Sequence, residues 1–369
     1  MKEKIKLYDF KKIFYISILI FIFIFFNLLN INIKAQSKDD YKLHKMKINY
    51  SQYIENNIFT INDLYNKDFS QPLIHPENSK ITRYNKQKII LTKKTNYSIG
   101  YIKEKESKYI INSDTLKLIK NNLNKINPRK NNYKIDFYSI SQSLEGISFN
   151  KKITHKNNFS LSLINKMLFG KKLIKRNYEG KAYKENDELI IEAFNHGINS
   201  NLNNIDENHN YSSYGYSLGI DTNYNFHKNL SINFYAKNLW SKIYWQKIFT
   251  NVSEINTDNI IINEEGYKEY ISSVTGNSYF DEYKTRLTPE YNFNANNKSY
   301  NIGIFYRNKL YPYFNCKVNS NPEIRVGFWS EYLTLKIKNN IFNLEIRTNN
   351  FLPSKITSIY LKLGINYSF

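Results

Sequence analysis

The chain has 369 residues, with 53 Lys and Arg against 32 Asp and Glu, which gives a formal net charge of +21. Its mean hydropathy is −0.58, which excludes a polytopic helical membrane protein, because that class needs repeated apolar stretches of about 20 residues. Aromatic residues make up 16% of the chain, more than a disordered basic tail carries, and a single cysteine (Cys316) excludes a disulfide framework or a Cys-based zinc site. Lys greatly outnumbers Arg, so coding bias competes with function as the cause of the charge.

The N-terminus has the pattern of an export signal. Several lysines precede an apolar run over residues 13–26, and Ile33, Lys34, Ala35 and Gln36 follow it. As a helix the run spans about 21 Å, which is shorter than a bilayer core of about 30 Å. We therefore expect a signal peptide over residues 1–35, cleaved between Ala35 and Gln36, with an uncleaved anchor as the alternative. Export and the absence of nucleic-acid-binding motifs argue against a nucleic-acid partner.

Residues 36–85 are polar and rich in Asn, with Gln71-Pro72 and His75-Pro76 as breakers. We expect them to form a periplasmic extension or a plug, followed by a barrel over residues 86–369. Further along, Leu116, Ile119 and Leu123 recur at helical spacing, and this predicts a short amphipathic helix over residues 114–127 at the periplasmic end.

Most of the remaining sequence alternates with a period of two residues. Apolar side chains occupy alternate positions from Tyr214 to Phe226, from Leu230 to Ala236 and from Ile359 to Phe369, with mostly polar residues between them. Side chains on a strand alternate between its faces, so each segment predicts a strand with one apolar face. Shorter segments with the same alternation begin at Phe159, Tyr300, Ile324, Leu333 and Phe342.

Strands of about 10 residues with one apolar face are typical of an all-β transmembrane protein, an antiparallel up-and-down barrel whose backbone is satisfied by closure. We predict 14 strands, with 12 to 16 open, over residues 86–93, 97–103, 133–141, 143–153, 158–170, 213–226, 229–241, 285–294, 298–307, 309–318, 322–330, 331–338, 341–349 and 357–369. Short turns then lie on the periplasmic side and two long insertions, 171–212 and 242–284, lie outside. A soluble all-β protein is the alternative.

The C-terminus, Lys362-x-Gly364-x-x-Tyr367-x-Phe369, resembles the assembly signal of bacterial outer-membrane barrels. The resemblance implies recognition by the barrel-assembly machinery and a place in the cell outer membrane, among its lipid and lipopolysaccharide. Residues 214–245 are similar to a hairpin of the FadL/PorV-type barrels, a resemblance that implies 14 strands and an N-terminal plug with an Asn-Pro-Ala segment. Here the nearest stretch, residues 75–78 (His-Pro-Glu-Asn), departs from that pattern.

The sequence offers little catalytic chemistry. Its six histidines have no metal-binding spacing, and no nucleophile elbow or phosphate-binding glycine loop is present. Asp206 to His209 is the one candidate cluster, and a solvated external loop is the better interpretation. We predict no enzyme activity, no metal and no cofactor.

The polar faces of the last strands suggest a charged lumen. If the apolar rows face lipid, the inner wall carries Arg325, Trp329, Lys336, Glu345, Arg347 and Lys362. A basic wall favours anions, although Glu345 is also placed to neutralise a neighbouring cation. We therefore expect a channel or transporter for a small hydrophobic or anionic solute. The alternative is a non-conducting scaffold or binding barrel, a secretion partner or an adhesin, that acts through its external loops.

Overall fold

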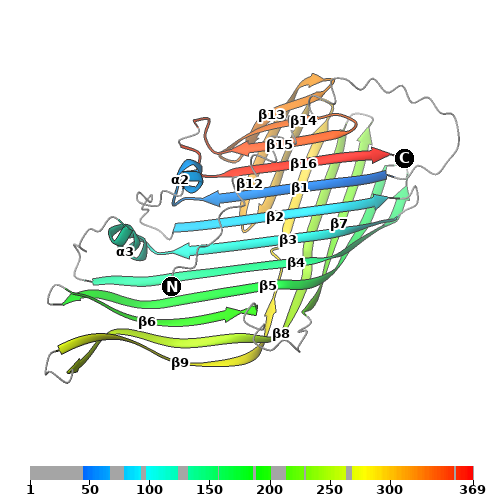
Figure 1. Ribbon diagram of the computed structural model, residues 1–369. Helices are drawn as coiled ribbons and strands as arrows, with labels where there is room; N and C mark the ends of the chain where they lie inside the picture. The colour runs from blue at the N-terminus through cyan, green and yellow to red at the C-terminus, as the bar shows by residue number, and fades with distance from the viewer. Residues whose placement is uncertain are drawn as a thin grey trace.

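The computed structural model describes residues 45–66, 79–92, 97–123, 132–156, 158–185, 188–200, 213–227, 230–262, 268–352 and 355–368. Nearly all of them lie in strands of one antiparallel sheet (Figure 1). The strands are β1 (Lys45–Asn56), β2 (Ser79–Thr92), β3 (Tyr97–Ile111), β4 (Asn132–Lys156), β5 (Phe159–Glu185), β6 (Glu188–Asn199), β7 (Tyr214–His227), β8 (Leu230–Ile262), β9 (Lys268–Thr285), β10 (Glu290–Asn297), β11 (Tyr300–Arg307), β12 (Lys309–Ser320), β13 (Glu323–Trp329), β14 (Tyr332–Lys338), β15 (Phe342–Thr348) and β16 (Ile359–Ser368).

The sheet closes into a barrel of 14 strands, as predicted. The two ends of the chain complete it, since β16 pairs with β1 from Ser368 opposite Lys45 to Ile359 opposite Ile54. On the far side β5 pairs with β7 and β8 pairs with β10, so β6 and β9 stand outside the closed ring. Closure leaves no unpaired edge in the wall, which is the condition for a strand structure that crosses a membrane.

The two long insertions continue the barrel strands beyond its rim. β5 pairs with β7 as far as Phe169 and with β6 from Ile174 onward, and β8 continues between β6 and β9. Together they form a sheet that projects from the end opposite the C-terminus (Figure 1). We predicted these insertions at that end, but as loops; both faces of these segments carry polar residues, so alternation gives no strand signal there.

Two predicted strand assignments are wrong, and the errors cancel in the count. Residues 45–56 and 79–85, expected in a periplasmic or plug segment, pair in the wall as β1 and the start of β2. Conversely, segments 133–141 and 143–153 are one strand, β4, which passes through a register shift at Ser143 and Leu144 without turning back. The predicted signal peptide with Ala35 and Gln36, and the plug stretch 75–78, lie outside the described residues.

The predicted helix exists as α3 (Ser113–Leu123), but it lies at the end opposite the C-terminus, because β3 runs away from that end and leads into it. The segment that contains α3 covers the edge of β4 beyond the end of β3. There the Asn112 backbone N donates to Asp136 O at 3.1 Å, and the Asp136 backbone N donates to Thr115 Oγ1 at 2.9 Å. A capped edge is protected from pairing with another chain. A shorter helix, α2 (Ile61–Asn66), links β1 and β2.

None of the described helices has the length and apolar character needed to cross a membrane.

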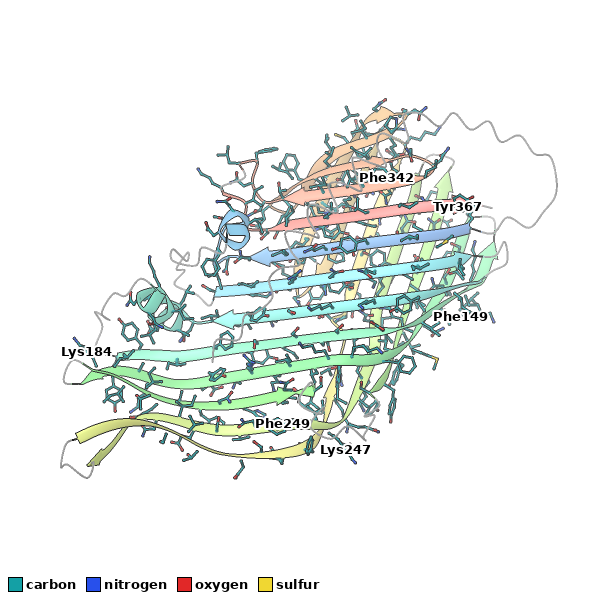
Figure 2. The ribbon with its side chains drawn as sticks, viewed as in Figure 1. Phe149, Lys184, Lys247, Phe249, Phe342 and Tyr367 are labelled. Atoms are coloured by element: carbon teal, nitrogen blue, oxygen red, sulfur yellow. The ribbon has the colours of Figure 1, made fainter. Side chains whose placement is uncertain are left out.

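The outer surface of the barrel is an apolar band bordered by aromatic rings. The predicted apolar rows are exposed, with Ile302 at 58% and Phe328 at 59%. On β7, exposed tyrosines at Tyr214 and Tyr224 mark the two borders. The ten residue-to-residue steps from Tyr214 to Tyr224 span about 25 Å at about 3.4 Å per step and a tilt of about 40°, which matches the apolar band of a transmembrane barrel. Phe149 and Tyr367 lie toward the C-terminal end (Figure 2).

Gly170 sits where β5 leaves β7, and a side chain there has no room. A Cβ at Gly170 would lie 2.5 Å from the Trp245 ring and 2.5 Å from Ser213 Oγ. We expect Gly170→Ala to lower the free energy of unfolding by about 1–3 kcal/mol through overpacking. Denaturant unfolding in detergent micelles measures this. The control is Gly197→Ala, whose Cβ would meet nothing closer than 3.8 Å; equal losses in both variants would contradict the packing argument.

Candidate functional site: an aromatic and cationic cavity in the lumen

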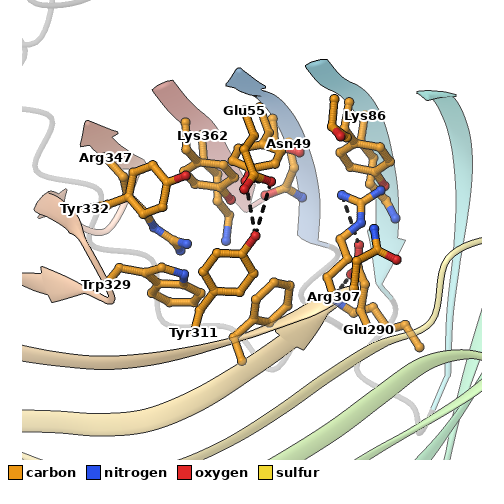
Figure 3. Close-up of a pocket in the computed structure, with 18 of the residues that line it drawn as sticks. Asn49, Glu55, Lys86, Glu290, Arg307, Tyr311, Trp329, Tyr332, Arg347 and Lys362 are labelled. Atoms are coloured by element: carbon orange, nitrogen blue, oxygen red, sulfur yellow. Dashed lines mark hydrogen bonds and ion pairs between the residues drawn. The ribbon is translucent and has the colours of Figure 1, made fainter. Parts of the chain in front are cut away.

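The barrel interior holds a cavity of about 340 Å³ between the β16–β1–β2 wall and the facing strands (Figure 3). Strand alternation turns polar side chains inward at these positions. The lining residues are Lys47, Asn49, Ser51, Tyr53, Glu55, Thr82, Tyr84, Lys86, Lys88, Tyr235, Lys237, Glu290, Phe305, Arg307, Asn308, Tyr311, Trp329, Tyr332, Arg347, Tyr360 and Lys362. Aromatic rings and cations dominate this list, and Glu55 and Glu290 are its carboxylates.

The rings form one cluster toward the end opposite the C-terminus. Trp329 stacks on Tyr313 with ring centroids 4.3 Å apart, and Phe305 lies 5.4 Å from the Trp329 ring. The Arg347 guanidinium lies between two rings, 3.3 Å from the Trp329 centroid and 4.3 Å from that of Tyr360. Such cation–π contacts hold Arg347 in place, so this part of the cavity presents flat ring surface.

Three lysines converge on the other part of the cavity. Lys47 lies on β1, Lys88 on β2 opposite Asn49, and Lys362 on β16 opposite Ser51, so they occupy adjacent strands at neighbouring levels. Among the described residues no ion pair joins any of the three to a carboxylate. Clustered ammonium groups that form no direct ion pair create a positive potential in a confined space.

Other cations in the lumen are compensated. The Glu104 carboxylate on β3 is 3% exposed and accepts from Lys86 Nζ at 2.5 Å and Lys166 Nζ at 2.9 Å. Lys166 also donates to Asn238 Oδ1 at 3.0 Å. Asn238 has a φ of 56°, a left-handed conformation that Asn tolerates, and this bulge turns its amide toward Lys166. The buried Glu104 carboxylate on β3 thus links Lys86 on β2 with Lys166 on β5.

Side chains from opposite walls also meet across the lumen. Arg307 on β11 donates to Glu106 on β3 at 3.0 Å and lies 3.7 Å from Glu290 on β10. Tyr311 on β12 donates to Glu55 on β1 at 3.3 Å (Figure 3). We call the Arg307–Glu106 contact the strut. It narrows the passage between the two walls.

Three of the six wall residues named from the sequence line the cavity, and four of the six, Arg347 among them, take part in ion pairs. Trp329, Arg347 and Lys362 line the cavity. Lys336 and Arg347 both pair with Glu345, the former at 3.5 Å, and Arg325 pairs with Glu323 on its own strand at 2.7 Å. Glu345 therefore compensates two cations, one more than the sequence alternative allowed. Lys47 was missed because residues 45–56 were not assigned to the wall; Lys86 and Lys88 lie in the predicted strand 86–93, but only the polar faces of the last strands were used to name wall residues.

The remaining predicted residues are placed as follows. In β16, Lys362 faces the cavity, Gly364 is buried beside Asn49 and Asn343, and Tyr367 is 63% exposed on the outer face. Phe369 and the Asp206–His209 cluster lie outside the described residues. Within the described part of the chain, no three His, Cys, Asp or Glu side chains are grouped so as to hold a metal ion.

No protein-family model matches this sequence, and comparison with curated proteins gives no match. The fold is similar to that of the TodX deltaS2S3 mutant monoaromatic hydrocarbon channel, with a TM-score of 0.44, 6% identity and 90% and 91% of the two chains covered. It is also similar to the P. putida toluene transporter TodX, with a TM-score of 0.43, 7% identity and 90% of each chain covered. The outer membrane protease OmpT from Escherichia coli gives a TM-score of 0.24 at 7% identity, covering 91% and 99%. At these values the likeness is one of barrel architecture only.

Proposed function

We propose that the protein is an integral outer-membrane barrel that passes or binds small anionic solutes through the lumen cavity. The apolar band with aromatic borders supports membrane insertion, and the polar interior supports an aqueous path. One observation carries the choice of solute: Lys47, Lys88 and Lys362 line the cavity, and in the part of the chain that the structure describes none of them forms an ion pair with a carboxylate. An anion would supply the missing counter-charge.

The cavity also favours one of the two solute classes predicted from the sequence. A purely hydrophobic solute would take water away from the three ammonium groups and offer them no hydrogen bond, which is costly. A solute with an anionic group on a flat apolar body fits both parts of the cavity. The rings around Trp329 contact the apolar body, and the lysines bind the anionic group. The volume of about 340 Å³ suits a small molecule.

The projecting sheet supports a second candidate, a barrel that binds another molecule outside the membrane. On β9, Val274 is 66% exposed, Tyr279 46% and Phe280 57%. Exposed apolar side chains beyond the membrane band are typical of an interaction surface. This candidate requires no conduction, so the two are separable by experiment.

Purified protein in planar bilayers tests the proposal. A conducting barrel with anion-over-cation selectivity, measured as the reversal potential in a KCl gradient, supports it. Absence of both channel events and uptake of small aromatic carboxylates by liposomes containing the protein would contradict it and leave the binding barrel as the better account.

We expect Lys88→Gln to reduce the anion selectivity of the pore, because it removes the charge of one of the three cavity lysines and leaves a polar side chain only one bond shorter. The reversal potential measures the change. Lys151→Gln is the matched control: it removes the same charge from an exposed position on β4. A shift of equal size in the control would assign selectivity to total charge and not to the cavity.

A further inference from the structure

The outer wall carries a second group of cations where β7, β8 and β9 meet. Tyr214 on β7 lies opposite Tyr244 on β8, which lies opposite Lys284 on β9, and Tyr216 lies opposite Lys242. The Tyr214 and Tyr244 rings stack with centroids 5.4 Å apart. Lys242 Nζ is 4.8 Å and Lys284 Nζ 5.9 Å from the Tyr244 centroid. Two ammonium groups therefore gather around one ring on the outer face.

These cations have no counter-charge of their own. Arg286, two residues after Lys284, is exposed as well, and its charge acts on Lys242. Among the described residues no ion pair joins Lys242, Lys284 or Arg286 to a carboxylate, and Glu282, two residues from Lys284, forms none with it. We call Lys242, Lys284 and Arg286 the rim cations. An unpaired trio of like charges is stabilised by an anion from outside the chain.

A neighbouring pair of lysines shows the contrast. Lys103 lies opposite Glu145, which lies opposite Phe169, and Phe169 lies opposite Tyr214, so all four lie in one cross-strand row of the outer wall. Lys103 pairs with Glu145 at 2.8 Å, and Lys171 lies 3.9 Å from the same carboxylate. In and beside this row, these lysines on β3 and β5 form ion pairs with a carboxylate, and among the described residues the rim cations do not.

The rim cations stand at the border of the membrane band. Trp240, 67% exposed, lies two residues before Lys242 on the side of the band, and Met167, 66% exposed, lies opposite Tyr216 in the same cross-strand row as Lys242. The exposed Tyr214 and Tyr216 belong to the aromatic border itself. In a transmembrane barrel such rings sit at the level of the lipid head groups. The rim cations therefore lie at the depth where lipid phosphates are found.

We propose that Lys242, Lys284 and Arg286 bind the phosphate groups of a membrane lipid at the outer rim of the barrel. The proposal rests on the outer-membrane placement above but not on conduction, so the two fail separately. At that surface the fitting ligand is a phosphorylated glycolipid, whose acyl chains lie along the apolar band beside Trp240. The phosphate oxygens accept from the three cations, and the Tyr244 ring holds the two lysines in position.

Titration of diphosphorylated lipid A into the full chain in a neutral detergent, followed by native mass spectrometry, tests this site. We expect saturable binding of one lipid, and a loss of about fivefold in affinity for each rim cation replaced by Gln, the effect of one basic residue near an anionic membrane surface. Lys242→Gln/Lys284→Gln is the first variant to compare with the unchanged protein.

The matched control is Lys103→Gln/Lys171→Gln, which removes two outer-wall cations that are already paired. Unchanged lipid affinity in the control, with weakened affinity in the rim variant, supports the site. Equal weakening in both would overturn it in favour of nonspecific attraction. Equal binding of lipid A stripped of its phosphates would overturn it in favour of acyl-chain contact, and equal binding of inorganic phosphate would show a site for a soluble anion instead of a lipid.

Discussion

Glu104→Gln is expected to lower the free energy of unfolding by about 3–5 kcal/mol, because it leaves the buried Lys166 and the partly buried Lys86 without their shared counter-charge. Lys86 and Lys166 both pair with this carboxylate, and the Lys166 side chain is only 3% exposed. Burial makes the unpaired Lys166 ammonium costly, since water does not replace the lost contact. Denaturant unfolding in detergent micelles, followed by tryptophan fluorescence, gives the free energy directly.

The barrel contains a natural control for this prediction. Glu145 on the adjacent strand also holds two lysines, Lys103 and Lys171, but on the exposed outer face. Glu145→Gln should cost at most about 1 kcal/mol, as exposed ion pairs do. The double variant Glu104→Gln/Lys166→Met should regain part of the loss, because it removes one stranded charge as well. Similar costs for Glu104→Gln and Glu145→Gln would show that burial does not decide the energetics here.

Much of the barrel was predictable because one face of each strand meets an apolar environment. That requirement produces apolar residues at every second position in segments such as 214–226 and 359–367, and these residues are the outward-facing rows of the barrel. The pattern fails where the outer row is itself polar. On β1, Tyr50 and Gln52 share the outward face with Met46 and Ile48, so the strand that closes the barrel was taken for a periplasmic or plug segment.

The cavity was less predictable than the wall, for a reason of topology. Alternation assigns a side chain to the inside, and on that basis Trp329, Arg347 and Lys362 were named. It does not tell which inward residues meet across the lumen. Glu106 and Arg307 are 201 residues apart in sequence, and their contact depends on the curvature of the whole ring. Among the described residues, Lys88 likewise forms no ion pair because Glu104 pairs with Lys86 and Lys166, and Glu290 pairs with Lys237 and Arg307.

Arg307→Ser is expected to raise the single-channel conductance, because it removes the strut between β11 and β3. Arg307 contacts Glu106 at 3.0 Å and Glu290 at 3.7 Å, so its side chain occupies the passage between the walls. A shorter side chain leaves that space to water and ions, and pore width limits conduction. The change is measured as unitary current in planar bilayers under symmetric KCl.

Loss of the strut also leaves the Glu106 carboxylate without its cation, whereas Glu290 keeps Lys237 at 4.0 Å, so stability and conduction have to be separated. The double variant Arg307→Ser/Glu106→Gln removes one unpaired carboxylate and keeps the passage open, and it should conduct at least as well as the single variant. Arg325→Ser is the control for charge: Arg325 faces inward but bonds to Glu323 on its own strand and to Asn296 at 3.2 Å, without crossing to β3. If all three variants conduct like the unchanged barrel, the strut does not limit the passage; if only the two Arg307 variants conduct more, contact across the lumen sets the width of the pore.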